Sequence, residues 1–271
     1  MRLIALFCLS FMSVSAYAGD VPSCYGGALQ GSDQKLATEL FVVVDQTTPF
    51  DANLKQLIAD NVRPFLKAGN AITVVKFSAF TQGHYTDVLS SGKLDQGIDP
   101  SSRNDISKPV LAKFDQCMTN QPKLLGKLTG VALKKALSET TDEIQKSDVI
   151  KSLQDISGLV KKSTAQKKIV LLASDMLENS TITSFYKNKA VRLIDPTKEL
   201  KQVKGNELLG DFDKASIYVI GAGLLSKDAQ ASYRSPQTMQ ALKSFWDQYF
   251  TMSNAKLEDF GQPSLLRPLG D

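Results

Sequence analysis

The chain contains 271 residues, of which 42% are hydrophobic and 22% charged, and this composition excludes a wholly disordered or fibrous protein. Its 32 basic and 28 acidic residues give a formal charge of +4 without a dense run of Lys and Arg, so we expect no nucleic-acid partner. One His and three Cys exclude a histidine-rich metal site and a zinc site made of four cysteines.

The first 18 residues have the pattern of an export signal. Arg2 supplies a positive charge, residues 3–14 are mostly apolar, and a small-x-small cleavage signal ends at Ala18. The apolar stretch is too short to span a bilayer. We therefore expect cleavage after Ala18 and a periplasmic or secreted protein without membrane insertion. Residues 19–271 are predicted to form one domain with short terminal extensions.

Two cysteines, Cys24 and Cys117, remain after the signal. In an oxidising compartment such a pair is typical of a disulfide bond, which we predict here. A redox or nucleophilic role is the alternative, but the pair lacks the CxxC spacing of such sites.

The first part of the chain alternates strands with a helix. Residues 39–45 form a nearly unbroken β-branched run, which predicts a strand buried on both faces. Apolar residues then recur at helical spacing over 54–65, after an Asp51 that suits an N-cap. A second buried strand is predicted at 71–77, and an alternating pattern predicts a short antiparallel edge strand at 84–89.

The remaining elements continue the alternation. In chain order we expect a loop at 91–107, helices within 108–165, a buried strand at 168–174, a surface helix at 196–210, a strand at 216–221 and a helix from Ser235. Aromatic residues recur on one side of this last helix, which predicts core packing. The sequence therefore predicts a doubly wound α/β fold: a mostly parallel sheet with one antiparallel edge strand and helices on both faces.

Two acidic residues directly follow or end buried strands, namely Asp45 and Asp175. Ligands of open α/β sheets bind beyond the carboxyl ends of the strands, so we expect these carboxyl groups to meet there. Thr47 adds a hydroxyl two residues after Asp45. Such oxygen atoms suit a hard divalent cation, Mg²⁺ or Mn²⁺, which we expect to be held weakly.

In these motifs the chain resembles the von Willebrand factor A-like domain family. Asp45 and Thr47 match the start of the family's Asp-x-Ser-x-Ser motif, and Asp175 matches its later Asp. Residues 130–133 resemble a helix segment of the family, and residues 217–223 resemble its next strand. The resemblance implies a metal-ion-dependent adhesion site formed by Asp45, Thr47 and Asp175.

The chain departs from the family pattern in two places. Pro49 replaces the second Ser and offers no side-chain oxygen, and Lys127 stands where the resemblance places a Thr. An ammonium group there would neutralise the two carboxylates in place of a metal ion. The sequence therefore leaves open a site with weak metal binding and a site in which Lys127 replaces the metal.

The chain is also similar to exported bacterial proteins encoded near conjugation or secretion systems. The similarity lies in residues 45–49, 77–80, 174–179 and 233–236. It implies a non-catalytic adhesion or assembly module whose partner is an envelope protein or a component of a secretion or conjugation apparatus. We expect partner contacts at the loops that follow the strands. The candidate contact residues are Thr48, Glu178, Asn179 and Arg234.

Two other functions stay open. The same edge of the sheet would suit a periplasmic receptor for a small molecule or a divalent cation. A metal-assisted hydrolase needs two or more carboxylates around an open metal site, and only Asp45 and Asp175 present themselves. A serine hydrolase would have to use the single His84, and the chain lacks the Gly-x-Ser-x-Gly motif. We therefore predict a protein that is not an enzyme.

Overall fold

The structure is a computed structural model that describes residues 21–27, 29, 35–78, 85–138, 140, 147–187, 190–224 and 235–270. The predicted export signal at residues 1–18 lies outside these residues, so cleavage after Ala18 stays a prediction. The same holds for the expected single domain over 19–271. Among the described helices, none is both long and apolar enough to cross a bilayer.

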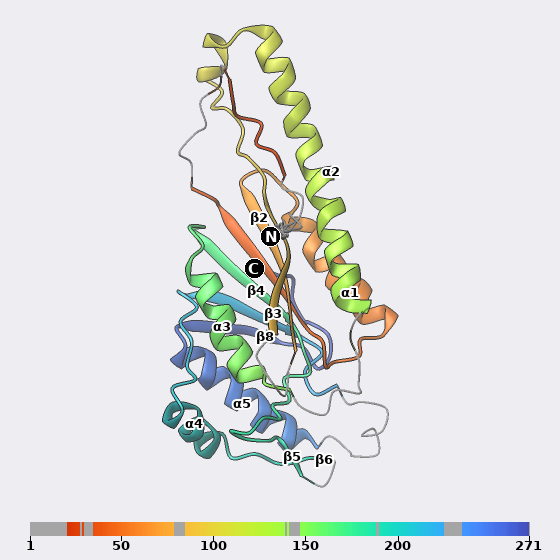
Figure 1. Cartoon of the computed structure of the whole chain (residues 1–271), viewed down its shortest axis with the longest axis vertical. Helices are drawn as coiled ribbons and strands as arrows, with labels where there is room; N and C mark the ends of the chain where they lie inside the picture. The colour runs from red at the N-terminus through yellow and green to blue at the C-terminus, as the bar shows by residue number, and fades with distance from the viewer. Residues whose placement is uncertain are drawn as a thin grey trace, which may run out of the picture.

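In the described part of the chain, six strands form the central sheet (Figure 1). They are β1 (Thr38–Asp45), β2 (Asn70–Ser78), β3 (Tyr85–Lys93), β4 (Lys167–Ala173), β7 (Ala215–Ile220) and β8 (Ala255–Phe260). Their order is β3-β2-β1-β4-β7-β8, and neighbouring strands are parallel except for β2 and β3. This is the order of a doubly wound sheet. The predicted fold class is confirmed, including the antiparallel edge strand.

Helices cover both faces of this sheet (Figure 1). The helices are α1 (Ala52–Val62) and α2 (Lys108–Ser138) on one face, with α3 (Val149–Lys161) and α5 (Pro236–Met252) on the other and α4 (Pro196–Gly205) against α5. In β1, Leu40, Val42 and Val44 pack toward α1 and α2, whereas Phe41 and Val43 pack toward α3 and α5. Because successive side chains of a strand point to opposite faces, this central strand contributes to both cores.

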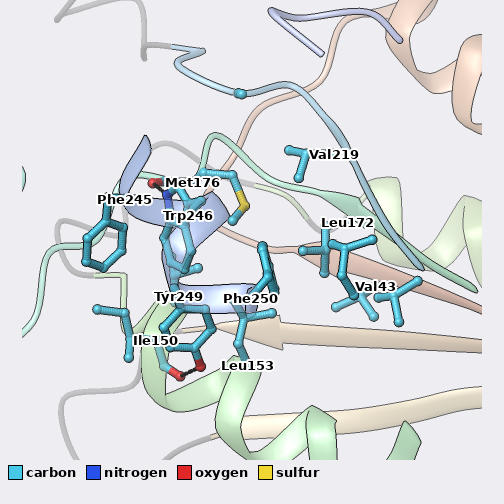
Figure 2. Packing of buried hydrophobic residues seen from close by; sticks show 14 of the residues in the cluster. Val43, Ile150, Leu153, Leu172, Met176, Val219, Phe245, Trp246, Tyr249 and Phe250 are labelled. Carbon is cyan, nitrogen blue, oxygen red and sulfur yellow. Dashed lines mark hydrogen bonds between the residues drawn. The ribbon is translucent and has the colours of Figure 1, made fainter. Parts of the chain in front are cut away.

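The aromatic side of α5 is buried, as predicted. Trp246, Tyr249 and Phe250 are fully buried, and their rings meet mostly edge to face (Figure 2). The indole N–H of Trp246 donates a hydrogen bond of 2.9 Å to the backbone carbonyl of Met176, just after β4. The core on this face is thus connected directly to the carboxyl end of the sheet.

Helix α2 projects well beyond the sheet and, with the chain segments beside it, forms an arm (Figure 1). We define the arm as residues 21–27, 94–107 and 108–121. The Cys24–Cys117 disulfide confirms the predicted pairing and joins the first segment to α2.

Polar contacts hold the rest of the arm together. The carboxylate of Asp95 accepts hydrogen bonds from Ser23 Oγ at 3.0 Å and from Gln121 Nε2 at 2.8 Å. Tyr25 and Phe114 make an edge-to-face contact with ring centroids 5.1 Å apart. The arm is therefore held by a covalent bond, a polar network and the packing of the buried Phe114 ring.

The structure also corrects several predicted boundaries. The helices predicted within 108–165 are α2 and α3, whereas the edge strand β3 runs to Lys93, into the predicted loop. The predicted start of that strand, His84, lies outside the described residues. The end of the helical pattern predicted over 54–65 is the short helix η1 (Arg63–Phe65). Elements absent from the prediction are the edge strand β8, the hairpin of β5 (Tyr186–Lys187) and β6 (Ala190–Val191), and the short helix η2 (Ser102–Asp105). These are short or polar, so hydrophobic periodicity does not mark them.

Candidate functional site

The carboxyl group of Asp45 lies at the end of β1 and is completely buried. One oxygen, Oδ1, accepts hydrogen bonds from the backbone N–H of Thr47 at 2.8 Å and from its hydroxyl at 2.6 Å. The other, Oδ2, accepts a hydrogen bond of 2.7 Å from Ser174 Oγ, which follows β4. The carboxyl thus joins the ends of two adjacent strands.

Asp175 belongs to the same edge of the sheet. Its backbone N–H donates to the hydroxyl of Thr48 at 3.0 Å, and its Oδ1 accepts a hydrogen bond of 2.8 Å from Leu177 N. Its carbonyl accepts another from Gly223 N at 2.8 Å, in a turn where Gly221 has a φ of +100°. A residue with a side chain would be strained there, so the glycine allows the chain to turn beside Asp175.

The two carboxyl groups affect each other strongly. Burial raises the pKa of Asp45, against the opposing effect of its hydrogen bonds. Burial and the charge of Asp45 raise the pKa of Asp175 well above its ordinary value. The same two carboxyls help to raise the pKa of the half-buried Tyr186, after the effect of burial. Among the described residues, no ion pair reaches either carboxyl. The geometry therefore brings together two acidic groups that repel each other when both are ionised.

A third loop contributes a hydroxyl that the sequence analysis missed. Ser147 is buried in front of α3, and its Oγ lies within hydrogen-bond distance of Thr47 Oγ1, at 3.1 Å. The signal was present, because Ser147 stands just before the apolar stripe that begins at Val149. We call Asp45, Thr47, Ser147, Ser174 and Asp175 the carboxyl cluster.

The donor set of the carboxyl cluster fits a hard divalent cation in its chemistry. It offers two carboxyl groups and neighbouring hydroxyls from three loops, which are the oxygen ligands that Mg²⁺ and Mn²⁺ take. The set has only two acidic ligands, since the described residues contain no group of three or more His, Cys, Asp or Glu side chains that could hold a metal. Asp45, Thr47 and Asp175 would supply the ligands, and Ser147 would stand in for the missing Thr of the family pattern.

Lys127 does not take part in this cluster, so its predicted role in replacing the metal is wrong. It is exposed on α2, whereas Asp45 and Asp175 are buried. The helix that begins beside the cluster is α3. Helix α2 instead ends there, where Gln46 Nε2 donates to the carbonyl of Ala136 at 2.8 Å. The resemblance therefore placed the helix start in the wrong helix.

Two of the predicted partner contacts are buried side chains, which cannot lie on a contact surface. Thr48 accepts the hydrogen bond from Asp175 described above. Glu178 accepts a hydrogen bond of 2.8 Å from Ile150 N, at the first turn of α3. Its burial raises its pKa to about 8. Glu178 thus caps α3 from a distant part of the chain, a role that no local sequence signal indicates.

The other two predicted contacts have different outcomes. Asn179 is half-buried and exchanges two backbone hydrogen bonds with Ser147, of 2.9 and 3.2 Å, so it positions the third loop of the cluster. Arg234 lies outside the described residues. Its predicted contact stays a prediction.

No protein-family model and no curated protein matches the sequence. Solved structures with some similarity include an aerotolerance-related membrane protein from Bacteroides fragilis, with 8% identity and a TM-score of 0.34 over 82% of this chain and 92% of that chain. The pilus adhesin SpaC from Lactobacillus rhamnosus GG has 13% identity and a TM-score of 0.39 over 85% of this chain and 29% of that chain. The PilB minor pilin from Streptococcus sanguinis has 13% identity and a TM-score of 0.36 over 83% of this chain and 63% of that chain. The fold class itself rests on the strand order and pairing.

Proposed function

We propose that this chain is an exported, von Willebrand factor A-like interaction module that is not an enzyme. The observation that supports this best is the carboxyl cluster, where Asp45 and Asp175 meet at the carboxyl edge of the sheet with hydroxyls from three loops. The loops around this edge would contact a protein of the envelope, in a secretion or conjugation apparatus.

The chemistry of the cluster favours binding over catalysis. Its described hydroxyls hydrogen-bond with neighbouring carboxyls or with each other, and the single histidine, His84, lies outside the described residues and is not placed beside them as a base. An activated hydroxyl nucleophile needs such a base. For a metal-assisted hydrolase, the described residues bring together only these two carboxyls and no group of three or more His, Cys, Asp or Glu side chains.

A cation would give the two carboxyls a role. When it binds, it supplies positive charge between groups whose mutual repulsion otherwise favours their protonated forms. Thr47 and Ser147 would orient Asp45 and complete the oxygen set. A divalent-cation receptor that uses the same cluster is the second candidate, because the cluster brings two carboxyl groups and the hydroxyls of three loops together.

Cation binding is tested by thermal unfolding of the mature protein in MgCl₂ or MnCl₂, compared with KCl at equal ionic strength. We expect a saturable rise in Tm that disappears in Asp175→Asn. The matched control is Asp60→Asn, which removes an exposed carboxylate on α1 and should keep the full rise. A flat response of the unsubstituted protein would contradict a cation site.

The partner surface is tested at exposed residues near the carboxyl edge. Asn53 follows the loop after β1, and Lys187 adjoins Tyr186 in the short hairpin; both are exposed. Asn53→Glu with Lys187→Glu should abolish recovery of a crosslinked partner from the native envelope. Lys162→Glu, at the opposite end of α3, should leave recovery unchanged. Equal recovery with all variants, at unchanged Tm, would contradict the proposed surface.

A further inference from the structure

Helix α2 carries a charge excess that the rest of the chain lacks. Between Lys108 and Ser138 the sequence contains six Lys and one Asp, a local charge of +5, while the whole chain has only +4. The remaining residues therefore have nearly no net charge. The single acidic residue, Asp115, is already paired with Arg103 at 2.6 Å.

The basic side chains of α2 all face the solvent. They are Lys108, Lys113, Lys123, Lys127, Lys134 and Lys135. None of the ion pairs among the described residues involves any of these six. At about 1.5 Å per residue, the five from Lys113 to Lys135 extend along roughly 33 Å of the helix. This basic face therefore takes part in no ion pair within the described part of the chain.

Two apolar side chains lie in the middle of the basic face. Leu124 is 36% exposed and Val131 is 63% exposed, and they stand seven residues apart. At 3.6 residues per turn, residues with this spacing fall in one line along the helix. On one side of this line are Lys127 and Lys134, and on the other is Lys135. The pattern is a narrow apolar seam with basic borders.

We propose that this face of α2 binds an acidic amphipathic helix of a protein partner. Leu124 and Val131 would contact the apolar side of that helix. The bordering lysines would pair with its Glu or Asp side chains, as charged residues do beside the seam of a coiled coil. The surface contains no residue of the carboxyl cluster, so it does not depend on the function proposed above.

The width of the seam favours a helix over a lipid surface. A helix that lies on a bilayer buries a broad apolar side in it. The broad apolar side of α2 instead packs against the sheet, through residues such as Leu125 and Leu133. What remains outside is a line of two apolar side chains, which matches the width of one partner helix.

The proposal is tested with a fluorescent peptide of about four heptads that has Leu at its a and d positions and Glu at e and g. Anisotropy measures its binding to the mature protein near physiological salt. One control peptide has the same composition in scrambled order, and a second has Lys in place of Glu. We expect saturable binding of the acidic helix alone, with hydrogen-exchange protection confined to residues 123–135 of α2.

Matched variants separate this seam from general electrostatics. Lys127→Glu with Lys134→Glu should weaken binding at least about tenfold, which is roughly 1.4 kcal/mol. Leu124→Ser with Val131→Ser should also weaken it, although the charge is unchanged. Lys201→Glu with Lys204→Glu, an equal charge reversal on exposed positions of α4, should change affinity less than about twofold. All variants alter exposed side chains, so the Tm should stay the same.

Three outcomes would overturn the proposal. The first is no saturable binding of the acidic peptide. The second is equal binding of the scrambled peptide, or equal weakening by the α4 variant, because both would indicate attraction without a seam. The third is that the peptide does not bind, whereas vesicles that contain phosphatidylglycerol do bind and lose this binding on charge reversal of Lys127 and Lys134. This result would assign the face to a lipid surface.

Discussion

The carboxyl cluster and the arm hold their polar groups in place by different means. At the cluster, buried carboxyls are positioned by hydrogen bonds on a backbone that the aromatic core of α5 supports (Figure 2). In the arm, Asp95 and the Cys24–Cys117 disulfide connect separate segments of the chain beside the buried ring of Phe114. The polar groups of the cluster are thus positioned without a covalent cross-link, whereas those of the arm lie beside one.

The largest effect is expected at the core that supports the cluster. Trp246→Ala removes a fully buried indole and its hydrogen bond to Met176, and should lower the free energy of unfolding by about 3–5 kcal/mol in urea denaturation. Trp246→Phe keeps a ring but loses the hydrogen bond, and should cost about 1–3 kcal/mol. If both variants unfold like the original protein, the core does not support this end of the sheet.

Removal of the disulfide should have the next largest effect. Cys24→Ser with Cys117→Ser removes the covalent link between two residues that are 93 positions apart in the sequence. Loss of a native disulfide typically costs about 2–5 kcal/mol. Hydrogen exchange should increase in the arm and stay unchanged at the cluster. Faster exchange at both places would show that the two regions are not supported independently.

Glu178, the buried cap of α3, predicts that the free energy of unfolding depends on pH. Burial raises the pKa of Glu178 from 4.5 to about 8, so the folded protein binds a proton that the unfolded chain releases. Its contribution to stability is complete below pH 4.5 and is lost as the pH rises toward 8. Glu178→Gln should flatten this part of the stability curve and raise stability at pH 8 by at most roughly 4 kcal/mol. An unchanged slope would exclude Glu178 as its source.

The smallest effect is expected at Lys127. Because its side chain is exposed on α2, Lys127→Ala should change the free energy of unfolding by less than about 0.5 kcal/mol. The Mg²⁺ response and the pH dependence should also stay as they are. A changed pH profile would restore the interpretation that Lys127 neutralises Asp45 and Asp175.

The sequence predicted most of the sheet because its central strands are unusually apolar. The runs that end at Asp45 and Ala173 are buried on both faces, so hydrophobicity marks them without ambiguity. Strand β8 is polar and half-exposed at the edge, and its pattern resembles a loop. Its backbone pairing with β7 makes it a strand, although its side-chain pattern does not predict one.

The candidate site was predictable in part for a similar reason. Asp45 and Asp175 follow apolar strands, and parallel strands end at the same edge, so their meeting follows from the pattern. Ser147 and Glu178 were not predictable as neighbours of this edge. Ser147 comes from the loop before α3, and Glu178 caps that helix across 28 positions of sequence.

The sequence alone determined the alternation of strands and helices, the pairing of two cysteines and the two acidic residues at strand ends, because each depends on local pattern or on a count. Only the tertiary structure decided which helix begins at the carboxyl cluster, that Thr48 and Glu178 are buried, and that Lys127 faces the solvent. These depend on how a helix is rotated and where it ends against the sheet. Packing between distant segments sets both, and no local run of residues records it.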